Sequence, residues 1–241
     1  MTSFEAANQG YEYLAQIVGQ HDLCTACLKI VGRQGHDVEN IKVTLHEKHG
    51  FDPERTRRIT SVVVQDIIDQ AKLSECQEFS LLCTNTLVAL CGGLENLVKD
   101  VVALAFVENI QFVEKLADQS LRVYASDILT RTDEERARSL VDALYQKEGA
   151  KRGHTERFMQ FLRYIDREIA IEKQSGTAID EAYEVRNAIV HRGSKIDHRL
   201  VKGVPNLSQE IGHPIDVGES KFRAYRKAIL QFADKITSSY L

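Results

Sequence analysis

The side chains best suited to chemistry lie in one short segment. Positions 184 to 193 read Glu-Val-Arg-Asn-Ala-Ile-Val-His-Arg-Gly. On a helix, at about 100° per residue, Arg186, Asn187 and His191 fall within one sector of roughly 140°. Asn187 and His191 stand four residues apart and are neighbours on a helix surface, so the amide can orient the imidazole.

This set of side chains suits RNA cleavage without a metal ion. In that reaction the ribose 2′-OH loses a proton, the leaving 5′-oxygen gains one, and charge builds on the phosphorane. Histidine transfers protons near neutral pH, and arginine presents a fixed fork of donors to phosphate oxygens. Two such helices facing each other in a dimer would supply two proton-transferring groups. Tyr183 and Val190 lie in the same sector, which favours packing against a second subunit.

The segment resembles the Arg-Asn-x-x-x-His form of the HEPN superfamily, which runs here from Arg186 to His191. The resemblance implies an all-α bundle and a metal-independent endoribonuclease that needs no cofactor and acts on RNA as a homodimer. It implies that His191 is the general acid and base, that Arg186 stabilises the scissile phosphate, and that Asn187 orients them. Glu95 matches the polar or acidic residue that the family favours on an earlier helix.

The same resemblance implies a cellular setting. HEPN ribonucleases occur in toxin, antiviral-defence and stress systems, so an antitoxin or a defence complex is an expected partner. One subset of the family carries a modified tyrosine two residues after the histidine, where this chain has Gly193. That form of regulation is therefore not expected. The resemblance covers roughly residues 75–241, and residues 1–72 match no family.

Three other interpretations stay open. The segment can be a simple helix end, with Arg186 paired to Glu184 or Asp180 and His191 near the negative end of the helix dipole. The chain can be a non-catalytic HEPN-like RNA-binding or protein-interaction module, in which the motif helix serves dimerisation. It can also be a helical subunit of a larger complex that docks through its N-terminal part.

Basic residues gather after the motif and in three other places. We predict RNA-backbone contacts for Arg192, Lys195, His198 and Arg199, with a solvated loop as the alternative. The clusters at 151–157 and 221–227 fit solvated helix faces. The cluster at 55–58 fits either a helix-turn-helix contact with nucleic acid or solvated charge at a helix start. Their members are Lys151, Arg152, His154 and Arg157; Lys221, Arg223, Arg226 and Lys227; and Arg55, Arg57 and Arg58.

No metal site is expected. His21, Cys24 and Cys27 have ligand-like spacing, but the chain has no second Cys-x2-Cys pair, and cysteines three apart often only pack. Cys76, Cys83 and Cys91 lie on one stripe of the expected helix, because they recur at intervals of seven and eight residues. This pattern predicts that all three are in the core. The sequence has no glycine-rich phosphate loop and no nucleophile elbow, so ATP-dependent and hydrolase-fold chemistry lack support.

Periodicity and helix-start signals predict the helices that position these residues. The expected ranges are 3–33 in one or two pieces, 37–50, 53–71 after Asp52-Pro53, and 75–105 after a Ser74–Gln77 capping box, bent or split at Gly92-Gly93. They continue with 132–147 after a Thr132–Glu135 capping box, 155–173, 178–192 after a break at Gly176, and 220–237. A long loop with a short hairpin is expected over 195–218.

Composition agrees with an all-α, multi-helix bundle. Three prolines and no tryptophan in 241 residues, with 43% hydrophobic residues, favour long helices and a substantial core. A net charge of −4 excludes a global basic field, so RNA contact must use a local patch. We expect an HEPN-like bundle over residues 74–241 and an N-terminal helical extension of unknown role over residues 1–73.

Location follows from what the chain lacks. No signal peptide is evident, and the longest apolar stretch, 97–107, is broken by Lys99 and Asp100, so no membrane association is expected. Five cysteines without a dense disulfide pattern fit the reducing cytoplasm.

Overall fold

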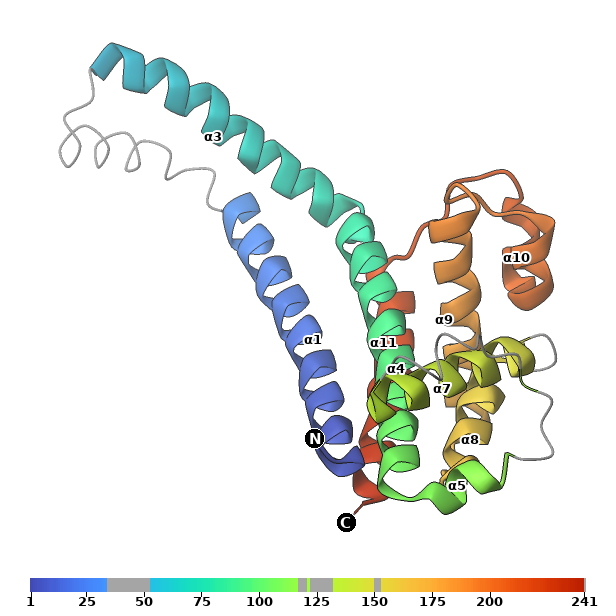
Figure 1. Ribbon diagram of the computed structural model, residues 1–241. Coiled ribbons are helices and arrows are strands. Elements are labelled where there is room, and N and C mark those ends of the chain that lie inside the picture. The colour runs from blue at the N-terminus through green and yellow to red at the C-terminus, as the bar shows by residue number, and fades with distance from the viewer. Residues whose placement is uncertain (34–52, 117–120, 122–131, 150–152, 241) are drawn as a thin grey trace.

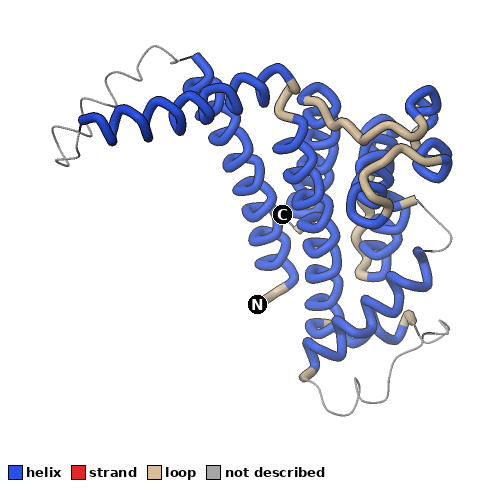
Figure 2. Tube along the Cα trace, turned by 90° about the horizontal axis from the view of Figure 1, so that it is seen from above, coloured by secondary structure: helices blue, strands red, loops and turns tan. Residues whose placement is uncertain are grey.

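The computed structural model describes residues 1–33, 53–116, 121, 132–149 and 153–240, except for the side chains of 53–64, 149, 208 and 209. These residues form helices and loops with no strand among them, which confirms the all-α prediction (Figure 2). The helices are α1 (Ser3–Arg33), α3 (Pro53–Cys76), α4 (Ser80–Glu108), α5 (Ile110–Glu114), α7 (Asp133–Gly149), α8 (His154–Tyr164), α9 (Lys173–His191), α10 (His198–Gly203), the 3-10 helix η1 (Pro205–Glu210) and α11 (Glu219–Ser238).

Helix α4 is the centre of the bundle. It is the most apolar of the long helices, as expected of a helix with several neighbours, and its buried residues continue from Cys83 to Phe106. Helices α1 and α11 pack against it, and so do α7, α8 and α9 (Figure 1). One continuous core therefore extends from α1 to the last turns of α11.

Close packing between α1 and α4 depends on small residues. A Cβ at Gly93 would lie 2.8 Å from Leu14 Cδ2, and a Cβ at Gly10 would lie 2.7 Å from Leu97 Cγ. Of the bend or split predicted at Gly92-Gly93, the split is wrong, because the helix passes both glycines without interruption, and the bend stays a prediction. Gly93 therefore permits the close approach of α1.

The chain breaks its helix at residues 77–79, just after the expected capping box. Ser74 lies inside α3, and its hydroxyl donates to the Gln70 carbonyl at 2.8 Å, so the Ser74–Gln77 capping box is not formed. Glu78 and Phe79 adopt left-handed φ values of 49° and 55°, and α4 begins at Ser80. Phe79 is only 3% exposed, so burial of its ring stabilises this left-handed turn.

Some of the other predicted helix boundaries are confirmed and some are wrong. The Thr132–Glu135 capping box is confirmed, with Glu135 N–H donating to Thr132 Oγ1 at 3.3 Å and Thr132 N–H donating to Glu135 Oε2 at 2.9 Å. Helix α3 begins at Pro53 as expected and continues to Cys76. Helix α8 ends at Tyr164 instead of about residue 173, and the break expected at Gly176 is wrong because Gly176 lies within α9.

Residues 195–218 contain more structure than the predicted loop. Asp197 caps α10 by accepting a hydrogen bond from Leu200 N–H at 2.7 Å, and η1 follows. In place of a hairpin there is one isolated antiparallel bridge between Lys195 and Pro214.

The N-terminal part is joined to the bundle through α1. Helix α3 runs back beside the end of α1 and projects beyond it (Figure 1). The proposed division after residue 73 falls inside α3 and stays a prediction, while α1 shares the core of the bundle. The helix expected over 37–50 lies outside the described residues. Among the helices that are described, none has the length and apolar character to cross a bilayer.

Candidate functional site

The motif helix α9 is held against the first turn of α8. Thr155 N–H donates to Asp180 Oδ1 at 2.8 Å, and the Thr155 hydroxyl donates to the Gly176 carbonyl at 3.0 Å. A Cβ at Gly153 would lie 2.8 Å from Asp180 Oδ2, so glycine leaves room for this carboxylate. Asp180 of α9 therefore caps α8 from outside, which fixes the position of His154.

An aromatic layer continues this contact towards α4. The rings of His154 and Tyr183 stack with centroids 4.3 Å apart and an interplanar angle of 17°. Phe158 packs edge-on against Tyr183 at 5.4 Å. The buried Tyr183 hydroxyl donates to the Cys91 carbonyl of α4 at 2.6 Å. Helices α4, α8 and α9 are thus joined directly beneath the motif.

Arg186 is half-buried beside this layer. Its Nη1 donates to Asn187 Oδ1 at 3.0 Å. Its Nε is buried and has no hydrogen-bond partner within the described residues. Burial, followed by the charges of Arg157 and Arg186, lowers the pKa of His154 to about 4. The imidazole is therefore neutral at pH 7, and Arg186 keeps donors that an oxyanion could use.

Glu95 belongs to a charged network between α4 and α7. Lys99 Nζ lies 2.9 Å from Glu95 Oε1 and 3.1 Å from Asp142 Oδ1. The same ammonium lies 4.2 Å from the ring centroid of Tyr145, and the Arg157 guanidinium carbon lies 4.6 Å from it. Burial raises the pKa of Tyr145 to about 12, and the negative charge of Glu95 adds to the effect. The Tyr145 ring is thus held as a neutral contact for two cations.

The charges of Glu95 and Arg186 shift the pKa values of the same two buried groups, Cys91 and Tyr183. Burial raises the pKa of the Cys91 thiol to about 12, while Arg186 opposes this effect and Glu95 strengthens it. Burial also raises the pKa of the Tyr183 hydroxyl, and here too Glu95 strengthens the effect while Arg186 opposes it. The structure therefore gathers Arg186, Asn187 and Glu95 in one region of the bundle.

His191 occupies a different environment on the same helix. It is the last residue of α9 and is exposed, and its ring has no hydrogen-bond or ion-pair partner in the described part of the chain. Five residues rise about 7.5 Å along an α-helix, so His191 lies more than one turn beyond Arg186. The preceding Val190 is 46% exposed. The imidazole is open to a substrate or to a second chain.

The pairing of Arg186 with Glu184 or Asp180 is not formed. Asp180 caps α8, and Glu184 faces Arg192, with Oε2 3.7 Å from Nη2. Arg192 also contacts Asp197 at 2.8 Å and thereby ties the end of α9 to the cap of α10. The other predicted RNA-binding residues are exposed: Lys195, His198 and Arg199. RNA contact by this stretch stays a prediction.

His154 and Arg157 were missed as site residues. They belong to a cluster assigned to a solvated face, which is wrong for Arg157, only 7% exposed, and for the stacked His154. A sequence signal was present. Phe158 follows His154 by four residues, and Phe161 follows Arg157 by four, so both polar residues share the apolar face of α8.

The cysteines do not converge on a site. His21 is buried, with Nε2 3.6 Å from Cys83 Sγ, whereas Cys24 and Cys27 are exposed. Within the described residues, no three acidic, histidine or cysteine side chains are arranged to hold a metal ion. The core prediction is confirmed for Cys83 and Cys91 and wrong for Cys76, which is exposed at the end of α3. The side chains of the basic cluster Arg55, Arg57 and Arg58 are not among those that the structure describes, so the interpretation of that cluster stays a prediction.

Comparison with known proteins finds no match: no protein-family model, no curated protein and no solved structure is similar to this chain. Fold and site by themselves define an all-α bundle whose motif helix carries a half-buried arginine, Arg186, and an exposed histidine, His191.

Proposed function

We propose that this protein is a metal-independent endoribonuclease of the HEPN type, acting as a homodimer. The observation that carries the proposal is the state of Arg186. Its guanidinium is half-buried, is held by Asn187, and has a buried Nε without a partner among the described residues. A half-buried cation without a carboxylate partner favours an anionic ligand, and the arginine fork matches phosphate oxygens.

The proposed chemistry assigns one task to each residue. His191 removes the proton of the ribose 2′-OH, whose oxygen attacks the phosphorus. The bond from phosphorus to the 5′-oxygen breaks, and His191 of a second copy protonates the leaving oxygen. The products are a 2′,3′-cyclic phosphate and a 5′-hydroxyl. Arg186 stabilises the charge on the phosphorane, oriented by Asn187, while Glu95 supports the network beneath it.

The exposed end of α9 supports the dimer. Val190 presents an apolar side chain next to His191, and burial of that side chain against a second copy would remove it from water. Such a contact would also bring two motif ends together. The exposed Lys195, His198 and Arg199 would then flank the shared site and contact the RNA backbone. On the family resemblance alone, we propose a cytoplasmic toxin, antiviral-defence or stress role with an antitoxin or defence-complex partner.

The test is cleavage of a mixed RNA pool in EDTA by the wild type, Arg186→Ala and His191→Ala. We expect 2′,3′-cyclic phosphate ends from the wild type and losses of about 10²–10⁴-fold in the His191 variant, the range for a lost general acid or base. His213→Ala is the matched control, since His213 is also exposed but lies outside the motif. It should cleave like the wild type.

Two outcomes would contradict the mechanism. One is cleavage that His191→Ala leaves intact, and the other is cleavage that requires an added divalent metal. Because His191 is exposed, its variant should show the thermal unfolding curve of the wild type, which separates lost chemistry from lost folding. RNA binding by a stable dimer without cleavage would favour the non-catalytic module, with the face at Val190 serving dimerisation.

A further inference from the structure

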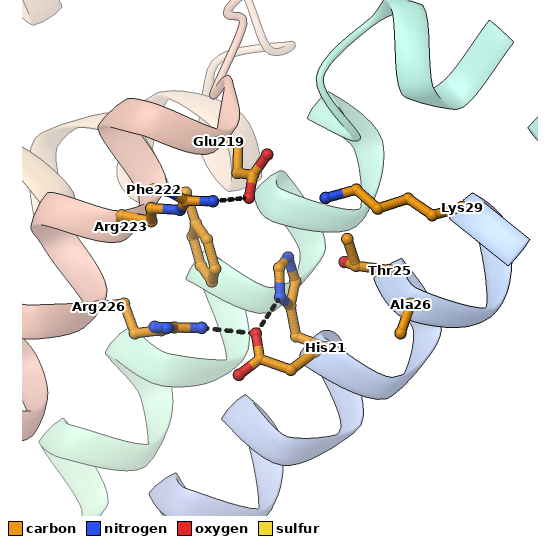
Figure 3. Close-up of a pocket in the computed structure, with 9 residues that line it drawn as sticks. His21, Thr25, Ala26, Lys29, Glu219, Phe222, Arg223 and Arg226 are labelled. Carbon is orange, nitrogen blue, oxygen red and sulfur yellow. Dashed lines mark hydrogen bonds and ion pairs between the residues drawn. The ribbon is translucent and has the colours of Figure 1, made fainter. Parts of the chain in front are cut away.

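A polar pocket lies between α1 and α11, and none of its lining residues belongs to α9. Its volume of about 300 Å³ is at the lower end of the range for small-molecule sites. Figure 3 shows charged side chains from both helices converging on it. The polar residues used below are Asp22, Thr25, Lys29, Glu219, Arg223 and Arg226.

Among the residues that line this pocket, three cations face two carboxylates. Arg226 Nη1 donates to Asp22 Oδ1 at 2.7 Å, and Arg223 forms an ion pair with Glu219. Lys29 is the additional cation. Within the described residues its ammonium contacts the face of the Phe79 ring, 5.2 Å from the centroid, and forms no ion pair with a carboxylate. Lys29 is thus the cation of the pocket lining that remains for an anion.

Thr25 supplies a second, independent sign of a ligand. The residue is only 7% exposed, it lines the pocket, and its Oγ1 is buried without a hydrogen-bond partner in the described part of the chain. A buried hydroxyl without a partner is unfavourable, and a ligand oxygen in the pocket would satisfy it. Figure 3 shows Thr25 beside Lys29 on the α1 wall, so one oxyanion could meet both donors.

The floor of the pocket is buried and closely packed. His21 is 5% exposed, its ring packs on Phe222 with centroids 4.5 Å apart, and its Nδ1 lies 3.3 Å from Asp22 Oδ1. Burial opposes ionisation of Asp22, but the hydrogen bonds from Arg226 and His21 hold its pKa below the ordinary value. Asp22 is therefore a carboxylate at neutral pH and a hydrogen-bond acceptor.

We propose that this pocket binds a small phosphorylated sugar. The phosphate would accept hydrogen bonds from Lys29 and Thr25. The sugar hydroxyls would donate to the second carboxylate oxygens of Asp22 and Glu219, whose first oxygens face the two arginines. This ligand site is separate from the motif on α9 and does not depend on RNA cleavage.

The test is isothermal titration of the full chain with ribose 5-phosphate, with ribose and with inorganic phosphate. We expect ribose 5-phosphate to bind about tenfold more tightly than inorganic phosphate, and ribose not to bind. Lys29→Met should weaken binding of ribose 5-phosphate by about tenfold, and Thr25→Val should weaken it less. Lys227→Met is the matched control, since Lys227 is exposed on α11 outside the pocket, and it should bind like the wild type.

The proposal is overturned if ribose 5-phosphate gives no binding at millimolar concentration, or if both pocket variants bind it as the wild type does. Equal affinity for inorganic phosphate would also overturn it, because the sugar would then contribute nothing. His191→Ala should bind ribose 5-phosphate normally, so failure of the ribonuclease proposal and failure of this one are distinguishable.

Discussion

The motif site and the α1–α11 pocket use similar residues in opposite ways. Both contain arginine, histidine and carboxylate side chains. In the motif site Arg157 is 7% exposed, and His154 is neutral because burial and two arginines lower its pKa to about 4. In the pocket Arg226 stands beside Asp22, whose side chain is 57% exposed. The buried Arg157 of the motif site lies over the Tyr145 ring, whereas Arg223 and Arg226 of the pocket pair with carboxylates near water.

This difference in burial predicts which single substitutions should change the stability of the protein most. Electrostatic and packing interactions are strong in a desolvated site, whereas exposed ion pairs are screened by water and salt. Variants near Tyr183 should therefore change stability far more than variants of the ion pairs along α1 and α11.

The largest effect is expected from Phe158→Ala. The Phe158 ring is fully buried and contacts both Tyr183 and Phe232 beneath the motif. Its removal should cost about 3–5 kcal/mol of unfolding free energy, as for other buried Phe to Ala changes. Urea unfolding measures this cost. Phe4→Ala is the control, since Phe4 is 39% exposed and should lose far less. Equal losses in both variants would remove the contrast between buried and exposed regions.

A second effect should appear as a pH dependence at His154. An unfolded histidine has a pKa of about 6.5, and that of folded His154 is about 4, so the unfolded state binds more protons between these values. The unfolding free energy should be highest above pH 6.5 and should fall, by up to about 3 kcal/mol, as the pH drops to 4.

The measurement is urea unfolding between pH 4 and pH 7. His154→Gln should show a smaller fall in stability than the wild type, because this variant has no titrating group there. The exposed His198 provides the control, and His198→Gln should keep the wild-type slope. An unchanged slope in His154→Gln would mean that His154 is not neutral in the fold. The pKa of folded Asp22 is lowered, so Asp22 also loses stabilisation near the acidic end of this window, but it does so equally in the wild type and in both histidine variants and cancels from their comparison.

The smallest effect is expected from Arg226→Gln. This change removes the ion pair with Asp22, which is partly exposed. Such pairs contribute about 0–1 kcal/mol, and the difference from the wild type should shrink further in high salt. Thermal unfolding at low and high salt measures it. A salt-independent loss above about 2 kcal/mol would show that the α1–α11 contact resembles the buried site after all.

Part of the fold could be predicted because its causes are local. The Thr132–Glu135 capping box and the helix start at Pro53 depend on residues within one turn, and both are confirmed. The break at Phe79 could not be predicted in this way, because its left-handed turn is stabilised by burial of the ring in the core. Gly93 is similar, since the contact that requires glycine comes from Leu14, far away in the sequence.

The candidate site divides in the same manner. The sequence by itself determined that Arg186, Asn187 and His191 share a helix, because spacing on a helix is a property of neighbours. Only the tertiary structure decided that Arg186 is half-buried, that His191 is exposed, and that His154 joins the site. These outcomes depend on the bond from Thr155 to Asp180 and on that from Tyr183 to the Cys91 carbonyl, which link residues 25 and 92 positions apart. Burial and charge balance are set by such distant contacts, which periodicity does not encode.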